Sequence, residues 1–88
     1  MEFQKESNRI FLEKDGVLLA EITFPLQEGV CCINRTFVDP SLRGQGVAGQ
    51  LMEQATAQIR SSGKKARAVC SYAVSWFEKH PDAQDLLE

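Results

Sequence analysis

A glycine-rich junction at residues 38–49 constrains the fold of this chain more than any other feature of its sequence. The stretch begins where a β-rich segment ends, passes through glycines at positions 44 and 46, and opens an amphipathic helix. Glycine lets a backbone approach an anion closely, and the first amide groups of a helix lack intrahelical acceptors. The helix dipole adds about half a positive charge at the same place. The junction therefore predicts an anion-binding turn between a strand and a helix.

The length and composition of the chain predict one modest globular domain over residues 1–88. Of its 88 residues, 43% are hydrophobic and 25% are charged, which is near the average for soluble proteins. The net charge of -2 argues against a nucleic-acid partner, because such proteins usually carry a basic face. The sequence has no apolar run of about 20 residues and begins with charged residues, which argues against a membrane span or a signal peptide. We therefore expect a cytoplasmic protein.

Three cysteines, Cys31, Cys32 and Cys70, do not have the number or spacing of a disulfide framework. Their number is odd, and no C-x-x-C spacing occurs. A zinc site is disfavoured for the same reason, so we expect no metal cofactor. This use of cysteine fits a reducing compartment.

Hydrophobic alternation predicts three antiparallel strands before the junction. The first covers residues 9–14, and the Asp15-Gly16 dipeptide after it favours a tight hairpin turn. The second covers residues 17–24, where every other residue is apolar. A turn at residues 27–29 leads to the third strand, residues 30–38, which is rich in β-forming residues. Together they predict a three-stranded meander.

Two helices and one further strand are predicted after the junction. The first helix begins near Gln45 and ends before Gly63, a typical residue at a helix C-terminus. Residues 66–70 predict a fourth strand, which would run parallel to the third because a helix joins them. Ser71 is the expected cap of a second helix over residues 72–79. The remaining tail is expected to be frayed except where its leucines dock. The sequence thus predicts an α+β fold of order β-β-β-α-β-α.

Residues 44–49 also spell G-x-G-x-x-G, the fingerprint of dinucleotide-binding folds. That fingerprint follows the first strand of a βαβ unit, and an acidic residue about 20 positions further on binds the ribose. Here the glycines follow three antiparallel strands, and Val69-Cys70-Ser71 at the end of the next strand offers no carboxylate. The order of the strands therefore argues against a dinucleotide site.

Residues 43–48 have the form Arg/Gln-x-x-Gly-x-Gly/Ala, which resembles the acetyl-coenzyme A (acetyl-CoA) pyrophosphate loop of the GCN5-related N-acetyltransferases. Two later segments occur in the same order as in the small single-domain bacterial subgroup of that family: Cys70-Ser71-Tyr72 and Trp76-Phe77-Glu78-Lys79-His80-Pro81. The resemblance covers residues 30–87. It implies a minimal version of the family fold, with acetyl-CoA as co-substrate.

The resemblance also implies a set of coenzyme-binding residues. In the family, two parallel strand ends splay apart, which here would be those at Val38 and Cys70. The resemblance implies that the pantetheine arm pairs with the exposed backbone of Phe37 and Val38, as an added strand would. The pyrophosphate is held by amide groups of the loop and the helix start. The residues implied are Phe37, Val38, Arg43, Gly44, Gln45, Gly46, Val47, Ala48 and Gly49.

The base that removes a proton from the acceptor amine is missing from its usual position. Many larger relatives use a carboxylate in the region of the third strand, where this chain has Asn34, Arg35 and Thr36. Arg35 stands where the subgroup often has histidine, and arginine does not deprotonate in proteins. A shared base mechanism is therefore not expected.

Cys70 and Tyr72 are the candidate catalytic residues. Cys70 precedes a helix N-terminus, which favours a thiolate, so it is either a nucleophile that carries the acetyl group, a neutral residue beside the thioester, or a small buried residue. Tyr72 can protonate the departing thiolate or pack in the core. His80 stands beside Pro81 at the end of a predicted helix, so we expect it to cap the helix or pack against it rather than to act as a base.

The sequence leaves the acceptor and the turnover open. The chain has no room for the segments that enclose the acceptor in larger relatives, which favours an exposed amine such as a protein lysine or N-terminus. The leading hypothesis is an acetyl-CoA-dependent N-acetyltransferase. The alternatives are a module that binds acetyl-CoA with little turnover and an interaction domain whose glycine loop is structural. We expect a monomer or a weak dimer.

Overall fold

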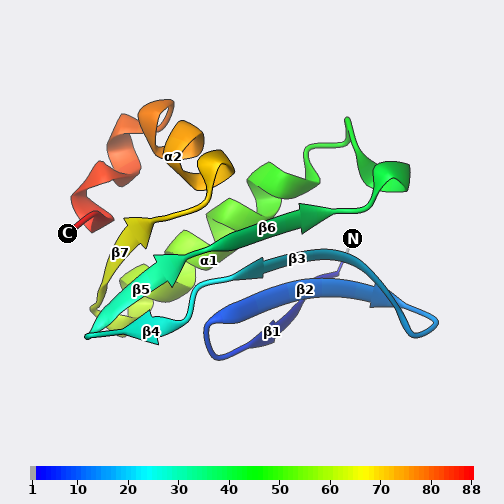
Figure 1. Cartoon of the computed structure of the whole chain (residues 1–88), viewed down its shortest axis with the longest axis horizontal. Helices are drawn as coiled ribbons and strands as arrows, with labels where there is room; N and C mark the ends of the chain where they lie inside the picture. The colour runs from blue at the N-terminus through cyan, green and yellow to red at the C-terminus, as the bar shows by residue number, and fades with distance from the viewer. Residues whose placement is uncertain (1) are drawn as a thin grey trace.

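The computed structural model describes residues 2–88 and has an α+β fold, as predicted. Figure 1 shows its elements, which follow in chain order as β1 (Gln4–Glu6), β2 (Arg9–Lys14), β3 (Val17–Thr23), β4 (Leu26–Gln27), β5 (Val30–Ile33), β6 (Arg35–Val38), the 3-10 helix η1 (Pro40–Leu42), α1 (Val47–Ser62), β7 (Lys65–Ala68), α2 (Ser71–Glu78) and the 3-10 helix η2 (Pro81–Leu86).

The strands form two sheets that meet where β5 passes into β6. The first sheet has the order β1-β2-β3-β6 and is antiparallel throughout. The second has the order β4-β5-β7, and β7 runs parallel to β5, which confirms the predicted parallel pairing. Figure 1 shows α1 behind the strands, with α2 and η2 beside β7. Over the described residues, neither α1 nor α2 is long and apolar enough to cross a membrane.

The third predicted strand is divided at Asn34, so the prediction of one continuous strand is wrong. The Asn34 and Arg35 residues both lie opposite Thr23, whose carbonyl accepts the Asn34 N–H at 3.2 Å. Two residues opposite one form a β-bulge, which shifts the alternation of side chains along the strand. Ile33 therefore faces the core, whereas Arg35 faces the other side of the sheet and binds Glu21. The bulge separates the two sheets.

The hairpin and the central helix follow the local sequence closely. Asp15 and Gly16 both have positive φ, +52° and +78°, as the predicted turn requires. On β3 the alternation buries Ala20 and Ile22 completely. The helix α1 ends at Gly63, which has the left-handed conformation. The hairpin turn, the alternation on β3 and the end of α1 each depend on residues that are close together in the sequence, and all three were predicted.

The structure differs from the prediction in two short strands, in the cap of the second helix and in the C-terminal tail. Two short strands, β1 and β4, were missed because β1 is exposed without alternation and β4 has two residues. The cap of α2 is Cys70 rather than Ser71, and it makes no side-chain capping hydrogen bond. The tail is ordered as η2, in which Ala83 and Leu86 are buried against the rest of the molecule. The predicted docking of Leu86 is therefore confirmed, whereas the predicted fraying around it is wrong, because Ala83 is buried as well.

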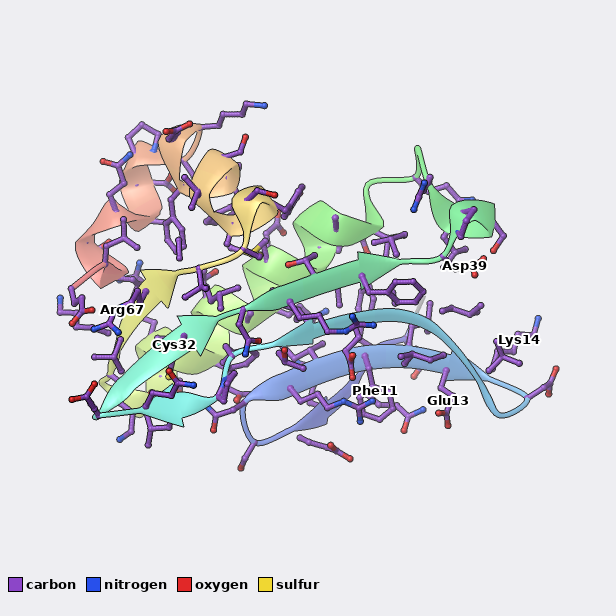
Figure 2. All side chains as sticks on the ribbon, in the orientation of Figure 1. Phe11, Glu13, Lys14, Cys32, Asp39 and Arg67 are labelled. Carbon is purple, nitrogen blue, oxygen red and sulfur yellow. The ribbon has the colours of Figure 1, made fainter. Side chains whose placement is uncertain are left out.

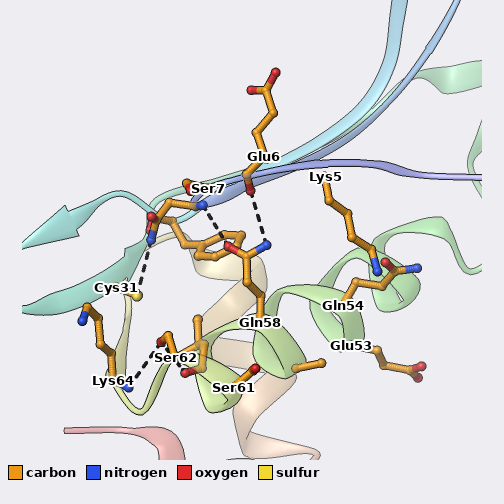
Figure 3. Close-up of a pocket in the computed structure, with 14 residues that line it drawn as sticks. Lys5, Glu6, Ser7, Cys31, Glu53, Gln54, Gln58, Ser61, Ser62 and Lys64 are labelled. Carbon is orange, nitrogen blue, oxygen red and sulfur yellow. Dashed lines mark hydrogen bonds between the residues drawn. The ribbon is translucent and has the colours of Figure 1, made fainter.

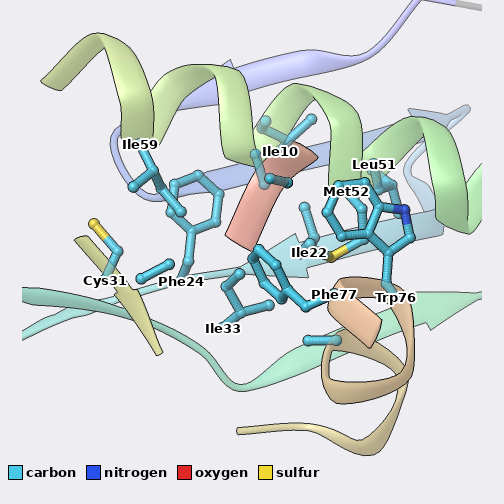
Figure 4. Close-up of a cluster of buried hydrophobic side chains, with 14 of the residues drawn as sticks. Ile10, Ile22, Phe24, Cys31, Ile33, Leu51, Met52, Ile59, Trp76 and Phe77 are labelled. Carbon is cyan, nitrogen blue, oxygen red and sulfur yellow. The ribbon is translucent and has the colours of Figure 1, made fainter. Parts of the chain in front are cut away.

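The hydrophobic core lies between α1 and the two sheets, and α2 closes one side of it. Figure 4 shows side chains from the strands, from α1 and from α2 meeting in one cluster. The indole of Trp76 meets the Phe77 ring edge to face, with centroids 5.2 Å apart. The largest completely buried members of the core are Ile10, Ile22, Phe24, Ile33, Leu51 and Met52. This packing fixes the start of α1 against the end of β6.

Candidate functional site

The loop after β6 is held by its own hydrogen bonds. The Asp39 carboxylate accepts the Ser41 N–H at 3.0 Å and the Ser41 hydroxyl at 2.6 Å, and these bonds keep the pKa of Asp39 below its usual value. The Leu42 N–H donates to the Asp39 carbonyl at 2.9 Å. Figure 2 shows Asp39 where β6 ends, beside η1. The turn is therefore built before the glycines begin.

Two glycines then bring the chain to the start of α1. Gly44 and Gly46 have φ of +83° and +74°, a left-handed conformation that favours glycine. A side chain at either position would meet no atom within 4 Å, so the requirement comes from the backbone and not from crowding. The Gly46 carbonyl accepts the Gln50 N–H at 3.1 Å and begins the helical hydrogen bonding. The space above both glycines is open.

The first turn of α1 keeps its hydrogen-bonding capacity. Within residues 2–88, no side chain caps this helix and its first turn carries no acidic residue. The N–H groups of Val47, Ala48 and Gly49 therefore have no intrahelical acceptor. These groups and the positive end of the helix dipole point toward the same open space. The arrangement suits an anion with several oxygen acceptors.

A cavity of about 250 Å³ opens at this helix start. Seven of its nine lining residues belong to the coenzyme set predicted from the sequence, and Leu42 and Tyr72 complete it. The seven are Val38, Arg43, Gly44, Gly46, Val47, Ala48 and Gly49. Phe37 and Gln45 do not line it, and the Gln45 amide instead donates to the Ser41 carbonyl at 3.4 Å.

Tyr72 reaches from α2 to the start of α1. A Cβ atom on Gly49 would lie 3.9 Å from the Tyr72 hydroxyl oxygen, so the phenol lies across the first turn of α1. Partial burial raises the pKa of Tyr72 above its usual value. The phenol is therefore a neutral hydrogen-bond donor at neutral pH.

Cys70 lies where β7 leaves the sheet. The N–H groups of Val69 and Cys70 both donate to the Ile33 carbonyl at 3.0 Å, immediately before the bulge. The Cys70 sulfur lies 3.5 Å from the hydroxyl oxygen of Thr36 on β6. Sequence analysis did not select Thr36, because its inward direction depends on the bulge and the alternation does not reveal a bulge. The structure thus brings Thr36 of β6 close to Cys70, the residue that caps α2 after β7.

The outer edge of β6 has peptide groups that β3 does not use. The Asp39 N–H donates to the Leu19 carbonyl at 2.8 Å, and hydrogen-bonded pairs alternate along an antiparallel ladder. The peptide groups of Phe37 consequently pair with β3, whereas those of Thr36 and Val38 point away from it. Among the described strands, β7 pairs with β5 alone and leaves this edge of β6 open.

The carboxylate of Glu21 lies on the opposite side of the sheet and is fully engaged. It accepts the Arg9 Nε–H at 2.6 Å and the Arg35 Nε–H at 2.9 Å. Burial opposes its ionisation, but the hydrogen bonds from the two arginines outweigh burial and lower the pKa of Glu21. Glu21 therefore stays ionised and is a poor proton acceptor.

His80 stacks on Trp76, with centroids 3.9 Å apart, which confirms its packing role.

A larger hollow of about 770 Å³ lies along the second half of α1. Figure 3 shows that polar side chains line it, and several of them bind one another. The Gln58 side chain accepts the Asn8 N–H at 2.9 Å and donates to the Glu6 carbonyl at 3.3 Å. Gln54 also lines this hollow, and its Oε1 is buried without a hydrogen-bond partner among residues 2–88. The smaller cavity is the stronger candidate for the predicted coenzyme site, because the glycine-loop residues line it.

Comparisons with known proteins agree with this geometry. The sequence profile of the GCN5-related N-acetyltransferase family matches residues 9–86. The NMR solution structure of a GCN5-like protein from Staphylococcus aureus has a TM-score of 0.80 and 29% identity, over 99% of this chain and 87% of that one. The aminoglycoside N-acetyltransferase AAC(6')-Iy in complex with CoA has a TM-score of 0.54 and 21% identity, over 85% of this chain and 64% of that one. No curated protein sequence matches the chain.

The chain therefore belongs to the GCN5-related N-acetyltransferases, the acetyl-CoA-dependent family that the sequence resembles. Its profile match begins at β2 and runs into η2, so the family assignment covers both sheets, the glycine loop and both α-helices. The second structure shares the fold at low identity and supports the architecture alone.

Proposed function

We propose that this protein transfers an acetyl group from acetyl-CoA to an exposed amine. The observation that carries the proposal is the start of α1, where unpartnered N–H groups open onto a cavity lined by the family's loop residues. The N–H groups of Val47, Ala48 and Gly49 would donate to the pyrophosphate, and Arg43 would add positive charge beside it. The glycines at positions 44 and 46 keep side chains out of this space.

The pantetheine arm would extend along the open edge of β6. The peptide groups of Thr36 and Val38 are free to pair with the two amides of the arm, as an added strand would pair. The peptide groups of Phe37 pair with β3, so pairing of the arm with the Phe37 backbone, as the resemblance implied, is not part of this proposal. An arm that follows this edge away from the loop carries the thioester toward Cys70.

Two side chains would serve the chemistry. Tyr72, a neutral phenol, would donate its proton to the departing thiolate. Cys70 would accept the acetyl group as a transient thioester and pass it to the amine. The open acceptor side suits an amine on a large molecule, such as a protein lysine or N-terminus.

The test of the coenzyme site is a titration with acetyl-CoA followed by amide NMR. We expect the largest shifts at residues 44–49, and unchanged signals there would contradict every coenzyme hypothesis. The test of catalysis is thiol release with a panel of amines, for the wild type and Cys70→Ala. Undiminished transfer by the variant would exclude the nucleophile role of Cys70.

A second candidate function is a module that binds acetyl-CoA with little turnover. The engagement of Glu21 by two arginines favours it, since this carboxylate beside β6 is a poor base. The two functions differ in one result of the experiments above. The module predicts NMR shifts at the loop without thiol release for any amine.

A further inference from the structure

Thr36 is the one polar side chain on β6 that contacts a candidate catalytic residue. Its hydroxyl oxygen lies 3.5 Å from the Cys70 sulfur, and either atom can be the donor. Both residues are half-buried, so water competes only partly for this contact. The loop motif does not include Thr36, and the role of its side chain is a separate question from the proposed pairing of its peptide groups with the coenzyme.

The backbone of both residues is fixed, which leaves the side chains little freedom. The Cys70 N–H donates to the Ile33 carbonyl at 3.0 Å, and its carbonyl accepts the Val74 N–H at 3.1 Å. Thr36 lies opposite Ile22 in the ladder between β3 and β6. Rotation of the Cys70 side chain is then the main remaining freedom, and the Thr36 hydroxyl limits it. A fixed sulfur position lowers the entropy lost on reaching the reacting geometry.

We propose that Thr36 is the positioning residue of Cys70 in acetyl transfer through a cysteine thioester. This inference rests on the proposed function. In the first step the Cys70 sulfur bonds to the acetyl carbon and the bond between that carbon and the coenzyme sulfur breaks. Tyr72 protonates the coenzyme sulfur, and the proton of the Cys70 thiol replaces the one that Tyr72 gives up. In the second step the amine nitrogen bonds to the carbon, the bond to Cys70 breaks, and a proton of the amine returns to the Cys70 sulfur.

The Thr36 hydroxyl serves both steps because it is donor and acceptor at once. It donates to the sulfur when the sulfur carries charge and accepts from it when the sulfur is protonated. Each step returns one proton to a sulfur, so a neutral amine reacts without a carboxylate that stores the proton. This proton balance explains how the chain can work while Glu21 is bound by Arg9 and Arg35.

The experiment measures the rate at which acetyl-CoA acetylates Cys70 in a single turnover, with no acceptor present. Intact mass gives the rate, and peptide mapping separates Cys70 from the two buried cysteines. We expect Thr36→Val to lower the rate roughly tenfold, the equivalent of one hydrogen bond, and Thr36→Ser to keep it near the wild type. The affinity for acetyl-CoA should be the same in all three proteins.

Thr56→Val is the matched control. Its hydroxyl donates to the Met52 carbonyl at 2.8 Å inside α1, so the same substitution removes a hydrogen bond away from Cys70. We expect wild-type acetylation in this variant. A wild-type rate in Thr36→Val would overturn the inference, as would a Thr36→Ser variant as slow as Thr36→Val.

A second measurement needs neither coenzyme nor transfer. Iodoacetamide alkylates Cys70 directly, and we expect slower alkylation in Thr36→Val than in Thr36→Ser or Thr56→Val. Equal alkylation rates in the three variants would show that the Thr36 hydroxyl does not affect Cys70, which would overturn the inference. Failure of the proposed function is distinguishable, because it shows in the wild type as no thiol release and no acetyl on Cys70. Failure of the inference shows in Thr36→Val as an unchanged rate in a protein whose wild type is acetylated.

Discussion

The two ends of α1 differ in how far their hydrogen-bonding groups are satisfied. At its end, the Gly63 N–H donates to the Arg60 carbonyl at 3.1 Å, and the Ser62 hydroxyl donates to the Ile59 carbonyl at 2.6 Å. Arg60 also holds Asp85 with two hydrogen bonds of 2.7 and 3.1 Å. At its start, no side chain of residues 2–88 caps the helix. The same helix is closed at one end and open at the other.

The larger of the two cavities lies away from the predicted coenzyme loop. The hollow beside the second half of α1 measures about 770 Å³ and the cavity at its start about 250 Å³. Several groups around the larger space bind one another, although Gln54 Oε1 there has no partner within the described part of the chain, whereas the smaller space adjoins the uncapped start of α1. The glycine-loop residues that line the smaller cavity therefore identify the candidate site better than volume does.

The largest expected effect separates two glycines with the same backbone conformation. Gly46 begins α1 with φ of +74° and Gly63 ends it with φ of +76°, and neither has an atom within 4 Å of an added Cβ. Alanine at either position should cost about 1–2 kcal/mol of folding free energy, measured by urea unfolding. Only Gly46→Ala should also weaken acetyl-CoA binding, by at least about tenfold. Equal affinity in the two variants would show that the open end is not the coenzyme site.

A smaller effect follows from adding charge at each end. Ala48→Glu puts a carboxylate in the first turn, and Ser61→Lys puts an ammonium in the last turn. Each charge complements the helix dipole and should stabilise the fold by a few tenths of a kcal/mol. Ala48→Glu should also repel the pyrophosphate and lower the affinity for acetyl-CoA, which calorimetric titration measures. Weaker acetyl-CoA binding by Ser61→Lys would contradict the proposed difference between the two ends of α1.

The smallest effect concerns the closed end and its dependence on pH. The hydrogen bonds from Arg60 lower the pKa of Asp85. A carboxyl group with a lowered folded pKa stabilises the protein above its unfolded pKa and loses that contribution as pH falls through the folded pKa. Wild type should therefore exceed Asp85→Asn in stability near neutral pH and match it in acid, as judged by urea unfolding across pH. Acetyl-CoA affinity at neutral pH should be the same in both proteins.

Local chemistry explains which parts of the fold were predictable. The Asp15-Gly16 turn and the glycines of the loop require positive φ, and residue type reports that requirement directly. The bulge at Asn34 depends on how β6 meets β3, and no residue type signals it. Because the bulge was not predicted, neither was the split of the third strand nor the inward direction of Thr36.

The candidate site divides in the same way. The loop residues were predictable because their spacing is contiguous, and most of them line the cavity. Leu42 was missed because it precedes the motif, which begins at Arg43. The position of Tyr72 over Gly49 depends on the packing of α2 against α1, which the sequence does not report. The roles of Cys70 and Tyr72 in catalysis stay predictions.

The bulge at Asn34 also shows what kind of genetic change would close the open edge of β6. The open edge follows from one additional residue in the ladder and not from the chemistry of that residue. Substitution at this position would leave the count of residues unchanged and the two sheets apart. Deletion of Asn34 would make Ile33 and Arg35 direct neighbours, keep Ile33 toward the core and Arg35 on the opposite side, and let β6 continue beside β7. The open edge of β6 thus depends on the number of residues in the strand and not on their types. An alignment that compares only residue identities would not reveal it.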